Sequence, residues 1–402
     1  MDNIIVFIFP FYLPNNFMIR KAYKYRIYPN TQQKIFFAKC FGCVRFFYNK
    51  SLTDMNEIYK STGKFENITP ASYKEDYPFL KEVDSLALSN AQLNRNTAFK
   101  SFFSHKSGFP KYKSKRNDQS YTTNNQGSVK ISDNNRYISI PKCSKVRIKM
   151  HRNFIGTIKS ITVSMTTDNK YYISILVEEE KKPLEAANKM IGLDLGIKDL
   201  IVGSNGKKYK NHKYLTKSQN KLAREQRKLS KMVKGSKNRN KQRIKVARLH
   251  KKICNQRNDY LHKLSKYIID ENQIICIEDL KVKDMMSDSK LARNISDVSW
   301  SRLVSMLTYK ANWYGRTIIK VPNDYPSSQL CHVCGYKNSI TKNLNIRKWV
   351  CPKCGSIHNR DINAARNILS KGIEILTKDG THPDSLFMLE SLGSSSKKPP
   401  LL

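Results

Sequence analysis

The sequence lacks an apolar run that could span a bilayer. Residues 4–13 are mostly apolar, but Pro10 interrupts them and a transmembrane helix needs about 20 apolar residues. Asp2 stands where a secretory signal carries positive charge, and no small-residue cleavage site follows. We therefore expect residues 1–17 to be an N-terminal extension ahead of a start at Met18. We expect the protein to be cytoplasmic, or nucleoid-associated in a bacterial host, with no membrane partner.

Acidic residues are scarce relative to basic ones. The chain has 32 Asp and Glu against 73 Lys and Arg, which gives a formal net charge of +41. This excess is far beyond what solubility requires and predicts a polyanionic partner, of which nucleic acid is the most common. A membrane surface is the competing interpretation. It is less favoured because the charge is spread over the whole length and not confined to one amphipathic helix.

The cysteines do not indicate disulfides. Their number is odd, nine, and no secretory segment precedes them, so metal ligation in a reducing compartment is favoured. Two C-x-x-C pairs separated by 16 residues have the spacing of a structural zinc ribbon, and Gly335 and Gly355 follow them as knuckle turns favour. We predict one structural Zn²⁺ ligated by Cys331, Cys334, Cys351 and Cys354, with His332 and His358 not needed as ligands.

Cys40 and Cys43 also have C-x-x-C spacing. They lie on an apolar helical stretch with no second pair close in sequence. Because a free cysteine is a small apolar side chain, we expect both to pack in the core.

The first half of the chain predicts helices followed by strands. Alternating residues from Met18 predict a strand closed by Pro29, and Thr31 is a candidate N-cap for a helix running to about Leu52. A second helix is expected over residues 85–103. After a basic, aromatic loop, short alternating runs up to residue 180 predict antiparallel strands that form a small barrel.

A second domain is expected from about Asn188. Three strands come first, with Asn205-Gly206 as the hairpin turn between the second and third. Residues 216–270 predict a basic helical hairpin whose turn lies at 235–240. The remaining expected elements are the strand N-Q-I-I-C-I-E-D-L, a helix over about 300–314, the strand T-I-I-K-V, a helix over about 362–369 and a disordered tail at 371–402.

Three carboxylates occupy positions where a charge is costly. Asp194 is central in I-G-L-D-L-G, and Glu278 ends the apolar strand I-C-I-E-D-L, where Asp279 is an alternative candidate. Asp194 could instead be neutralised by a nearby Lys or Arg. Asp361 could also serve as the N-cap of the helix that follows it. Taken together, the three acids suggest a site that collects divalent cations.

The order strand-Asp, later strand-Glu and helix-start Asp is the arrangement of an RNase H-like nuclease. In that fold the acids converge at one edge of the sheet and bind two Mg²⁺ about 3.5–4 Å apart, which flank the scissile phosphate. Mg²⁺ prefers such hard oxygen ligands. We predict that Asp194, Glu278 and Asp361 are the catalytic residues and bind Mg²⁺. Arg360 could contact the substrate phosphate or be an ordinary surface residue.

Several longer strings resemble one family. They include K-A-Y-K-Y-R-I-Y-P-N at 21–30, F-G-C-V-R-F-F-Y-N at 41–49, G-F-P-K-Y-K-S-K at 108–115 and Y-P-S-S-Q-L-C-H-V-C-G at 325–335. With the three acids and the four cysteines in this order, they resemble the TnpB family, the RNA-guided endonucleases long labelled OrfB transposases of insertion sequences. The resemblance covers about residues 18–370 and leaves out the first 17 residues and the tail.

The resemblance implies an α+β multidomain fold. An N-terminal wedge β-barrel with an inserted helical lobe would precede an RNase H-like (RuvC) α/β nuclease domain with an inserted zinc ribbon. The corresponding segments would be 18–30 and 104–187 for the barrel, 31–103 for the lobe, 188–325 and 356–370 for the nuclease, and 326–355 for the ribbon. The resemblance also implies a guide RNA from the element, a target DNA cut next to a short motif, and the seven site residues already named. We expect a monomer.

Two other functions would fit parts of the pattern. A non-cleaving regulator of transposition would keep the charge and the ribbon but would not need the acids. A strand-transferring transposase could use an RNase H-like site, but the sequence lacks the H-x-H and catalytic tyrosine arrangement of single-strand transposition.

Overall fold

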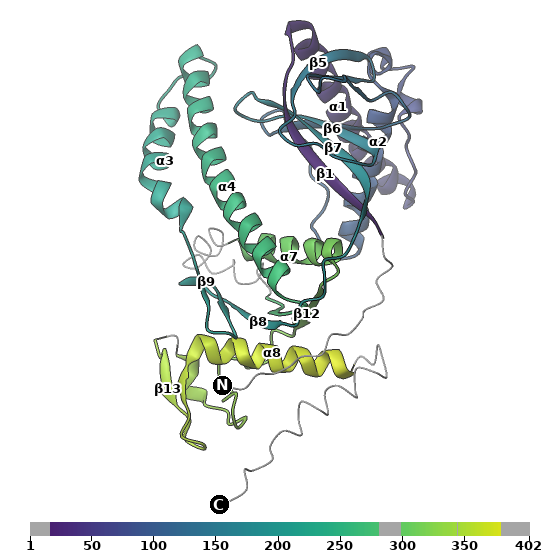
Figure 1. Ribbon diagram of the computed structural model, residues 1–402. Coiled ribbons are helices and arrows are strands. Elements are labelled where there is room, and N and C mark those ends of the chain that lie inside the picture. The colour runs from purple at the N-terminus through teal and green to yellow at the C-terminus, as the bar shows by residue number, and fades with distance from the viewer. Residues whose placement is uncertain (1–16, 281–298, 344, 379–402) are drawn as a thin grey trace, which may run out of the picture. The chain divides into compact units, whose positions relative to one another are not determined.

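The computed structural model describes residues 17–280, 299–343 and 345–378. The chain divides into two units. We call Met18–Glu180 together with Lys228–Arg248 the N-terminal unit, and Lys181–Arg227 together with the described residues from Leu249 on the C-terminal unit. Figure 1 gives the elements of each unit. None of the described helices is long and apolar enough to cross a membrane.

A seven-stranded sheet in the order β2-β6-β7-β1-β5-β4-β3 forms the base of the N-terminal unit. Its long strand β7 buries Ile173, Ile175 and Val177 completely while the residues between them stay partly exposed, as strand alternation requires. The strands predicted from this alternation are confirmed. Their bounds are β1 Phe17–Tyr28, β2 Gln119–Asn124, β3 Lys130–Ile131, β4 Tyr137–Ile140, β5 Cys143–Lys149, β6 Thr157–Met165 and β7 Tyr171–Lys181.

Two helices, α1 (Thr31–Thr62) and α2 (Ser85–Phe103), pack against this sheet and against each other. The bounds of α2 agree with the prediction. Those of α1 do not: Asn30, and not Thr31, is the N-cap, in a capping box with Gln33, and the helix continues to Gly63, whose φ of 69° ends it. Short 3-10 turns follow at Ala71–Tyr73 and Pro78–Glu82.

The cysteines of α1 are structural. Cys40 and Cys43 are both buried within the main apolar core of the N-terminal unit, so the prediction of core packing is confirmed. Burial raises the pKa of the Cys40 thiol to about 12, which keeps it protonated and unreactive.

The C-terminal unit contains a five-stranded sheet in the order β10-β9-β8-β11-β12. Strands β8, β9 and β10 form an antiparallel meander, whereas β11 lies parallel to both β8 and β12. The predicted turn between β9 and β10 is present, with Gly206 at a φ of 82°. The strands are β8 Met190–Leu195, β9 Asp199–Gly203, β10 Lys208–Lys210, β11 Ile274–Glu278 and β12 Thr317–Val321.

The predicted helical hairpin consists of α3 (Tyr214–Ser230) and α4 (Lys237–Glu271). The turn lies earlier than predicted, because α4 already begins at Lys237. The hydroxyl of Ser236 accepts a hydrogen bond from the amide of Arg239 (3.1 Å), so the serine caps the helix and fixes its start.

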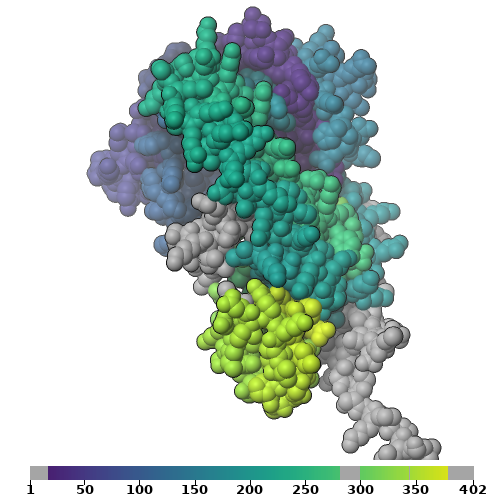
Figure 2. Space-filling model, turned by 90° about the vertical axis from the view of Figure 1, so that its left-hand side faces the viewer, coloured from purple at the N-terminus to yellow at the C-terminus, as the bar shows by residue number. Residues whose placement is uncertain are grey.

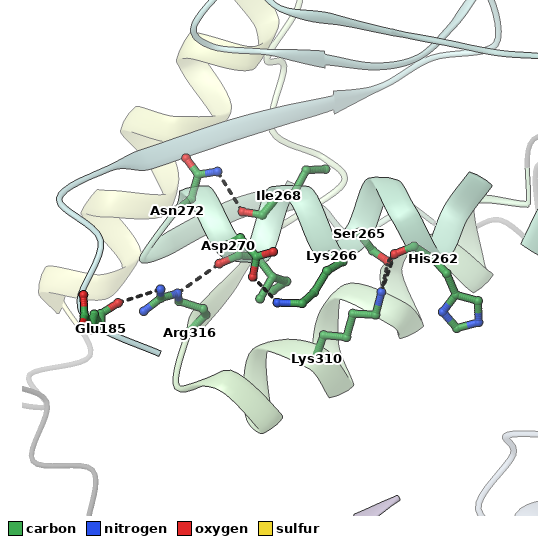
Figure 3. A network of polar contacts seen from close by, with 10 residues as sticks. Glu185, His262, Ser265, Lys266, Ile268, Asp270, Asn272, Lys310 and Arg316 are labelled. Atoms are coloured by element: carbon green, nitrogen blue, oxygen red, sulfur yellow. Dashed lines mark hydrogen bonds and ion pairs between the residues drawn. The ribbon is translucent and has the colours of Figure 1, made fainter. Parts of the chain in front are cut away.

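Helix α7 (Trp300–Tyr314), which agrees with its predicted bounds, is joined to α4 by buried polar contacts (Figure 3). Lys310 donates to the carbonyl of His262 and to the hydroxyl of Ser265, at 2.7 Å each. Arg316, just beyond α7, donates to the carbonyls of Ile269 (3.1 Å) and Glu185 (2.8 Å). These contacts satisfy two buried cations and fix the helices that support one side of the sheet.

Helix α8 (Arg360–Lys378) lies along one face of the sheet, against β8, β11 and β12 (Figure 1). It is longer than predicted: residues 371–378, expected in the tail, are helical, and residues 379–402 lie outside the described chain, as do residues 1–16. Close contact depends on Gly192 of β8, because a Cβ there would lie 2.1 Å from the carbonyl oxygen of Ala365.

The segment between β12 and α8 folds as a small ribbon. It contains a 3-10 turn at Ser339–Lys342 and the antiparallel strands β13 (Lys348–Val350) and β14 (Ile357–Asn359). Figure 2 shows this ribbon and α8 as one continuous yellow-green body. The mixed α+β composition predicted from the sequence is confirmed.

Candidate functional site

The strand register places Asp194 and Glu278 on neighbouring strands. Gly192 of β8 lies beside Cys276 of β11, and the next pair is Leu193 with Ile277. One residue further along each strand come Asp194 and Glu278. Both carboxylates therefore lie at the same edge of the sheet, where β8 and β11 end.

The two carboxylates also lie on the face covered by α8. A Cβ on Gly192 would meet α8, and Cys276 contacts Gly372 of the same helix. Side chains two residues apart in a strand lie on the same face, so Asp194 follows Gly192 and Glu278 follows Cys276 onto this face.

Asp361 lies in the first turn of α8. It is not the N-cap, because α8 already begins at Arg360 and the side chain of Asn359 accepts from the amide of Ile362 (3.2 Å). The start of α8 lies close to the β9–β10 turn, since Ile362 reaches within 3.9 Å of the Cβ position of Gly206. That placement brings Asp361 to the strand edge that carries Asp194.

The acids influence one another electrostatically. Burial, and then the nearby charges of Glu278 and Asp361, raise the pKa of Asp194 to about 7, against the opposing effect of Arg360 and Arg347. Burial also raises the pKa of Glu278. Over the described residues, no hydrogen bond or ion pair involves either carboxylate, so a nearby Lys or Arg does not neutralise Asp194 by direct contact.

Asp279, the alternative to Glu278, is in a different environment. Its side chain is exposed and forms an ion pair with Lys320 (2.9 Å). Glu278 instead is half-buried, and no ion pair among the described residues involves it. A half-buried carboxylate without a partner fits a ligand-binding role better than an exposed, paired one.

Two arginines accompany Asp361. Arg347, from the ribbon, donates through Nη1 to both oxygens of Asp361 (3.1 and 3.3 Å). Arg360 is buried, which excludes the surface alternative, and its Nε has no hydrogen-bond partner in the described part of the chain. Sequence reasoning singled out Arg360 but missed Arg347, which no motif distinguishes from the chain's many other basic residues.

The four ribbon cysteines converge. Their Sγ atoms all lie within 4.8 Å of one another. Two of the separations are 3.7 Å for Cys331 to Cys354 and 3.6 Å for Cys334 to Cys351. A tetrahedral zinc site with Zn–S bonds of about 2.3 Å has S···S edges of about 3.8 Å, which these two separations match.

Both cysteine pairs form the expected knuckle turns. Gly335 and Gly355 have φ angles of 73° and 71°, and their amides donate to the carbonyls of Cys331 and Cys351 at 2.9 Å. An L side chain would be strained at this φ, which explains the two glycines. His358 is buried, with Nε2 3.1 Å from the Sγ of Cys331, so it supports the thiol set from outside.

An amide clamp on α8 holds the first knuckle; we use this name for Asn363 and Asn367. Both donate to the carbonyl of Leu330 at 2.6 Å, and Asn367 also donates to that of Ser327 (2.7 Å). The Asn363 carbonyl oxygen accepts from the amide of His332 (3.0 Å). The clamp thus ties the cysteine ribbon to the helix that carries Asp361, and sequence reasoning missed it.

The two candidate metal centres differ in compactness. Among the described residues, the four cysteines are the one group of three or more acidic, histidine or cysteine side chains gathered tightly enough to hold a single ion. The three carboxylates lie at one edge of the sheet and influence one another electrostatically, but they are not gathered as tightly as the cysteines. Asp361 forms an ion pair with Arg347.

Comparison with known proteins gives three family matches. Residues 173–288 match a family described as a probable transposase, and residues 300–368 match a Cas12f1-like TNB domain. Residues 18–64, which form β1 and α1, match a helix-turn-helix domain of the same group.

Full-length relatives carry related names. A putative RNA-guided DNA endonuclease of Streptomyces pristinaespiralis is 36% identical over 365 residues, covering 88% of this chain and 90% of the relative. The putative RNA-guided DNA endonuclease InsQ of Escherichia coli strain K12 is 34% identical over 385 residues, covering 89% and 93%. Among solved structures, the Cas12f1-sgRNA-target DNA complex contains a chain of similar fold, with a TM-score of 0.54, 18% identity, and coverage of 87% of this chain and 98% of that one.

Proposed function

Since the chain belongs to the TnpB family of putative RNA-guided DNA endonucleases, we propose that it is an RNA-guided, Mg²⁺-dependent DNA endonuclease of an insertion sequence, cutting DNA next to a short motif. Its partners would be a guide RNA from the element and a target DNA. Base pairing with the guide would read sequence, while the protein would read the short motif and the shape of the heteroduplex.

The meeting of three acids at one sheet edge carries the proposal. The β8–β11 register supports the pairing of Asp194 with Glu278, and the close fit of α8 supports the addition of Asp361. The raised pKa of Asp194 agrees with this arrangement, because after burial Glu278 and Asp361 are its main causes.

These acids fit Mg²⁺ as ligands. They offer hard carboxylate oxygens, and neither Asp194 nor Glu278 accepts a hydrogen bond from any described residue. A bound cation would also relieve the repulsion between the acids. When bound, a pair of Mg²⁺ would lower the pKa of the attacking water and stabilise the leaving 3′ oxygen. Arg347, which pairs with Asp361, and the buried Arg360 would add positive charge beside the substrate phosphate.

We assign the remaining parts on the same basis. The cysteines Cys331, Cys334, Cys351 and Cys354 would hold one structural Zn²⁺, supported by sulfur separations close to those of a tetrahedron. The seven-stranded sheet would be the wedge barrel, α1 and α2 the helical lobe, the five-stranded sheet with α8 the RuvC-like nuclease, and the segment 326–355 the target-binding ribbon. The protein would act as a monomer.

A cleavage assay tests the proposal. The chain is purified with co-expressed element RNA and incubated with Mg²⁺ and a plasmid library that holds the target beside random flanking bases. We expect double-strand breaks next to one motif. Glu278→Gln should lower cleavage at least about a thousandfold, because it removes a metal ligand, while the matched control Asp279→Asn should cut like the wild type.

The two alternatives give different products in the same assay. Binding of the target without cleavage by the wild-type chain would indicate a non-cleaving regulator. Joined DNA ends would indicate a strand-transferring transposase, the activity in the description of the first family match. Either result would overturn the proposal.

A further inference from the structure

His358 is a buried histidine of the cysteine ribbon that the proposed function leaves without a role. It is 3% exposed and lies on β14, opposite Trp349 of β13. Its ring contacts those of Trp349 and His332, at centroid separations of 4.6 and 5.0 Å. These contacts, on a strand that is itself paired, fix the direction in which the imidazole points.

The imidazole directs its Nε2 at one cysteine. Nε2 lies 3.1 Å from the Sγ of Cys331, and it is not among the ligand atoms of the described chain that gather within 4.8 Å of one another. A nitrogen and a sulfur bound to the same tetrahedral zinc would lie about 3.6 Å apart. His358 is therefore placed to donate to Cys331 from outside the set of four thiols, and not to replace one of them.

Cys331 needs such a donor more than an exposed cysteine does. It is 1% exposed, so water does not reach its sulfur. Cys354, in contrast, is exposed, and its Sγ also lies 3.2 Å from the hydroxyl oxygen of Ser356. Four thiolates around Zn²⁺ leave an excess of about two negative charges. The buried side of such a centre costs free energy unless protein N–H groups donate to its sulfurs.

The neighbouring His332 is already engaged elsewhere. Its Nε2 lies 2.9 Å from Nη1 of Arg366, and a guanidinium only donates, so this Nε2 accepts and the ring proton lies on Nδ1. Nδ1 in turn lies 3.0 Å from the carbonyl oxygen of Asn363, to which it donates. Both ring nitrogens of His332 thus contact residues of α8, which leaves His358 as the imidazole of the ribbon that serves the thiols.

We propose that His358 is a positioning residue of the zinc site, which donates its Nε2–H to the Cys331 thiolate and so helps to retain the ion. The inference rests on the zinc assignment in the proposed function. A zinc-bound thiolate can only accept, so the imidazole proton lies on Nε2. The hydrogen bond orients the sulfur toward the ion and withdraws charge from it, which makes it a weaker nucleophile.

The test compares four variants of the full chain, purified under reducing conditions. His358→Phe keeps a flat ring beside Trp349 but has no donor, and His358→Asn has an amide too short to reach the sulfur. His358→Gln keeps an N–H donor of similar reach. The control, Trp349→Phe, alters the packing of the ring and keeps the donor. Thermal unfolding of the zinc-loaded proteins shows which variants are folded.

Three measurements are made on each folded variant. Zinc affinity is measured by competition with a chelator. Zinc release is followed while N-ethylmaleimide alkylates the thiols, which reports the nucleophilicity of the bound sulfurs. The same site also takes Co²⁺, and the intensity of the sulfur-to-cobalt charge-transfer absorption gives the number of thiolates bound.

The two donor-free variants should bind zinc about 10–100-fold more weakly than the wild type and release it correspondingly faster under alkylation, whereas His358→Gln and Trp349→Phe should stay within about threefold. The cobalt absorption should indicate four thiolates in every protein.

Equal affinities and release rates in the wild type and the donor-free variants would overturn the inference. An equal loss in Trp349→Phe would overturn it too, because packing and not the donor would then be responsible. A wild-type cobalt spectrum of three thiolates would make His358 a ligand, which also contradicts it. A wild type that binds neither zinc nor cobalt would instead refute the zinc assignment of the proposed function, which is a distinguishable result.

Discussion

Asp194 is a residue whose proposed function as a metal ligand lowers the stability of the metal-free fold. It lies in a strand, on the face that α8 covers, beside two other carboxylates and without a hydrogen-bond donor among the described residues. Its pKa is raised to about 7, whereas the ordinary value is 3.8. Ionising Asp194 therefore costs more free energy in the folded protein than in the unfolded chain.

The raised pKa of Asp194 makes the stability of the fold depend on pH. The folded state holds the Asp194 proton between pH 4 and pH 7 while the unfolded state releases it, so this group lowers stability as the pH rises through that window. In metal-free protein, Asp194→Asn should raise the free energy of unfolding at pH 8 by about 1–3 kcal/mol, with little difference near pH 4. Thermal unfolding across this pH range checks the expectation.

The same variant should respond differently to metal. Adding Mg²⁺ should raise the melting temperature of the wild type, more strongly at pH 8 than at pH 6, because the ion binds the ionised carboxylate. Asp194→Asn should lose most of this shift. An equal Mg²⁺ shift in both proteins would show that Asp194 is not a ligand.

At the scale of elements, α8 is the part that completes the candidate site. It packs on β8 and β11 so closely that residue 192 has no room for a side chain. Its first turn brings Asp361 to the edge where those strands end. A small change in its distance from the sheet would therefore move Asp361 away from the other two acids.

Gly192→Ala tests this contact. The added Cβ would lie 2.1 Å from the Ala365 carbonyl, so α8 must shift, and we expect a loss of about 2–4 kcal/mol in stability together with loss of cleavage. The control is Gly42→Ala in α1, where a Cβ meets nothing within 4 Å. That substitution should stabilise the protein by about 0.5–1 kcal/mol. Thermal unfolding of both variants gives the comparison.

A double substitution tests what the amide clamp contributes to the site. Asn363→Ala with Asn367→Ala leaves the Leu330 and Ser327 carbonyls without these donors, at about 1–3 kcal/mol for each buried group. We expect bound zinc, measured by metal analysis, to stay near one per chain while cleavage falls about tenfold or more, because Asp361 is positioned less well. The exposed Asn345→Ala in the same ribbon should change neither quantity. Loss of zinc from the double variant would show instead that the clamp holds the metal site together.

The sequence revealed the acids because their surroundings are unusual. A carboxylate inside an apolar strand pattern is rare enough to stand out, and two C-x-x-C pairs carry their own spacing. Local signals also gave the bounds of α2 and α7 correctly. The end of α1 was missed although Gly63 marks it, since the apolar spacing weakens after Leu52 and the prediction stopped there.

The partners of the site residues could not be predicted. Asn363 and Asn367 have the spacing of ordinary polar helix residues, and the carbonyl they share lies more than thirty positions away in the sequence. Arg347 is one basic residue among 73. Such contacts depend on which surfaces the fold brings together, and no local pattern encodes them.

At the scale of the whole molecule, the net charge of +41 shapes both units. The free chain must fold against its own repulsion, so it should be stabilised by any condition that screens charge.

Salt should therefore act in opposite directions on the free and the loaded protein. Raising NaCl from 0.1 to 0.5 M should increase the melting temperature of the RNA-free chain by several degrees, because screening relieves repulsion. The same change should lower the melting temperature of the RNA-bound chain, because bound RNA is released. A fall in both would mean that charge repulsion does not limit the stability of the free chain.

The late position of α8 has a consequence for synthesis on the ribosome. Strands β8 and β11 emerge well before the ribbon and α8, so a nascent chain presents Asp194 and Glu278 long before Asp361 exists. The proposed nuclease site is therefore incomplete until α8 has been synthesised and has packed against the sheet. Chains truncated before residue 360 should bind nucleic acid and never break it.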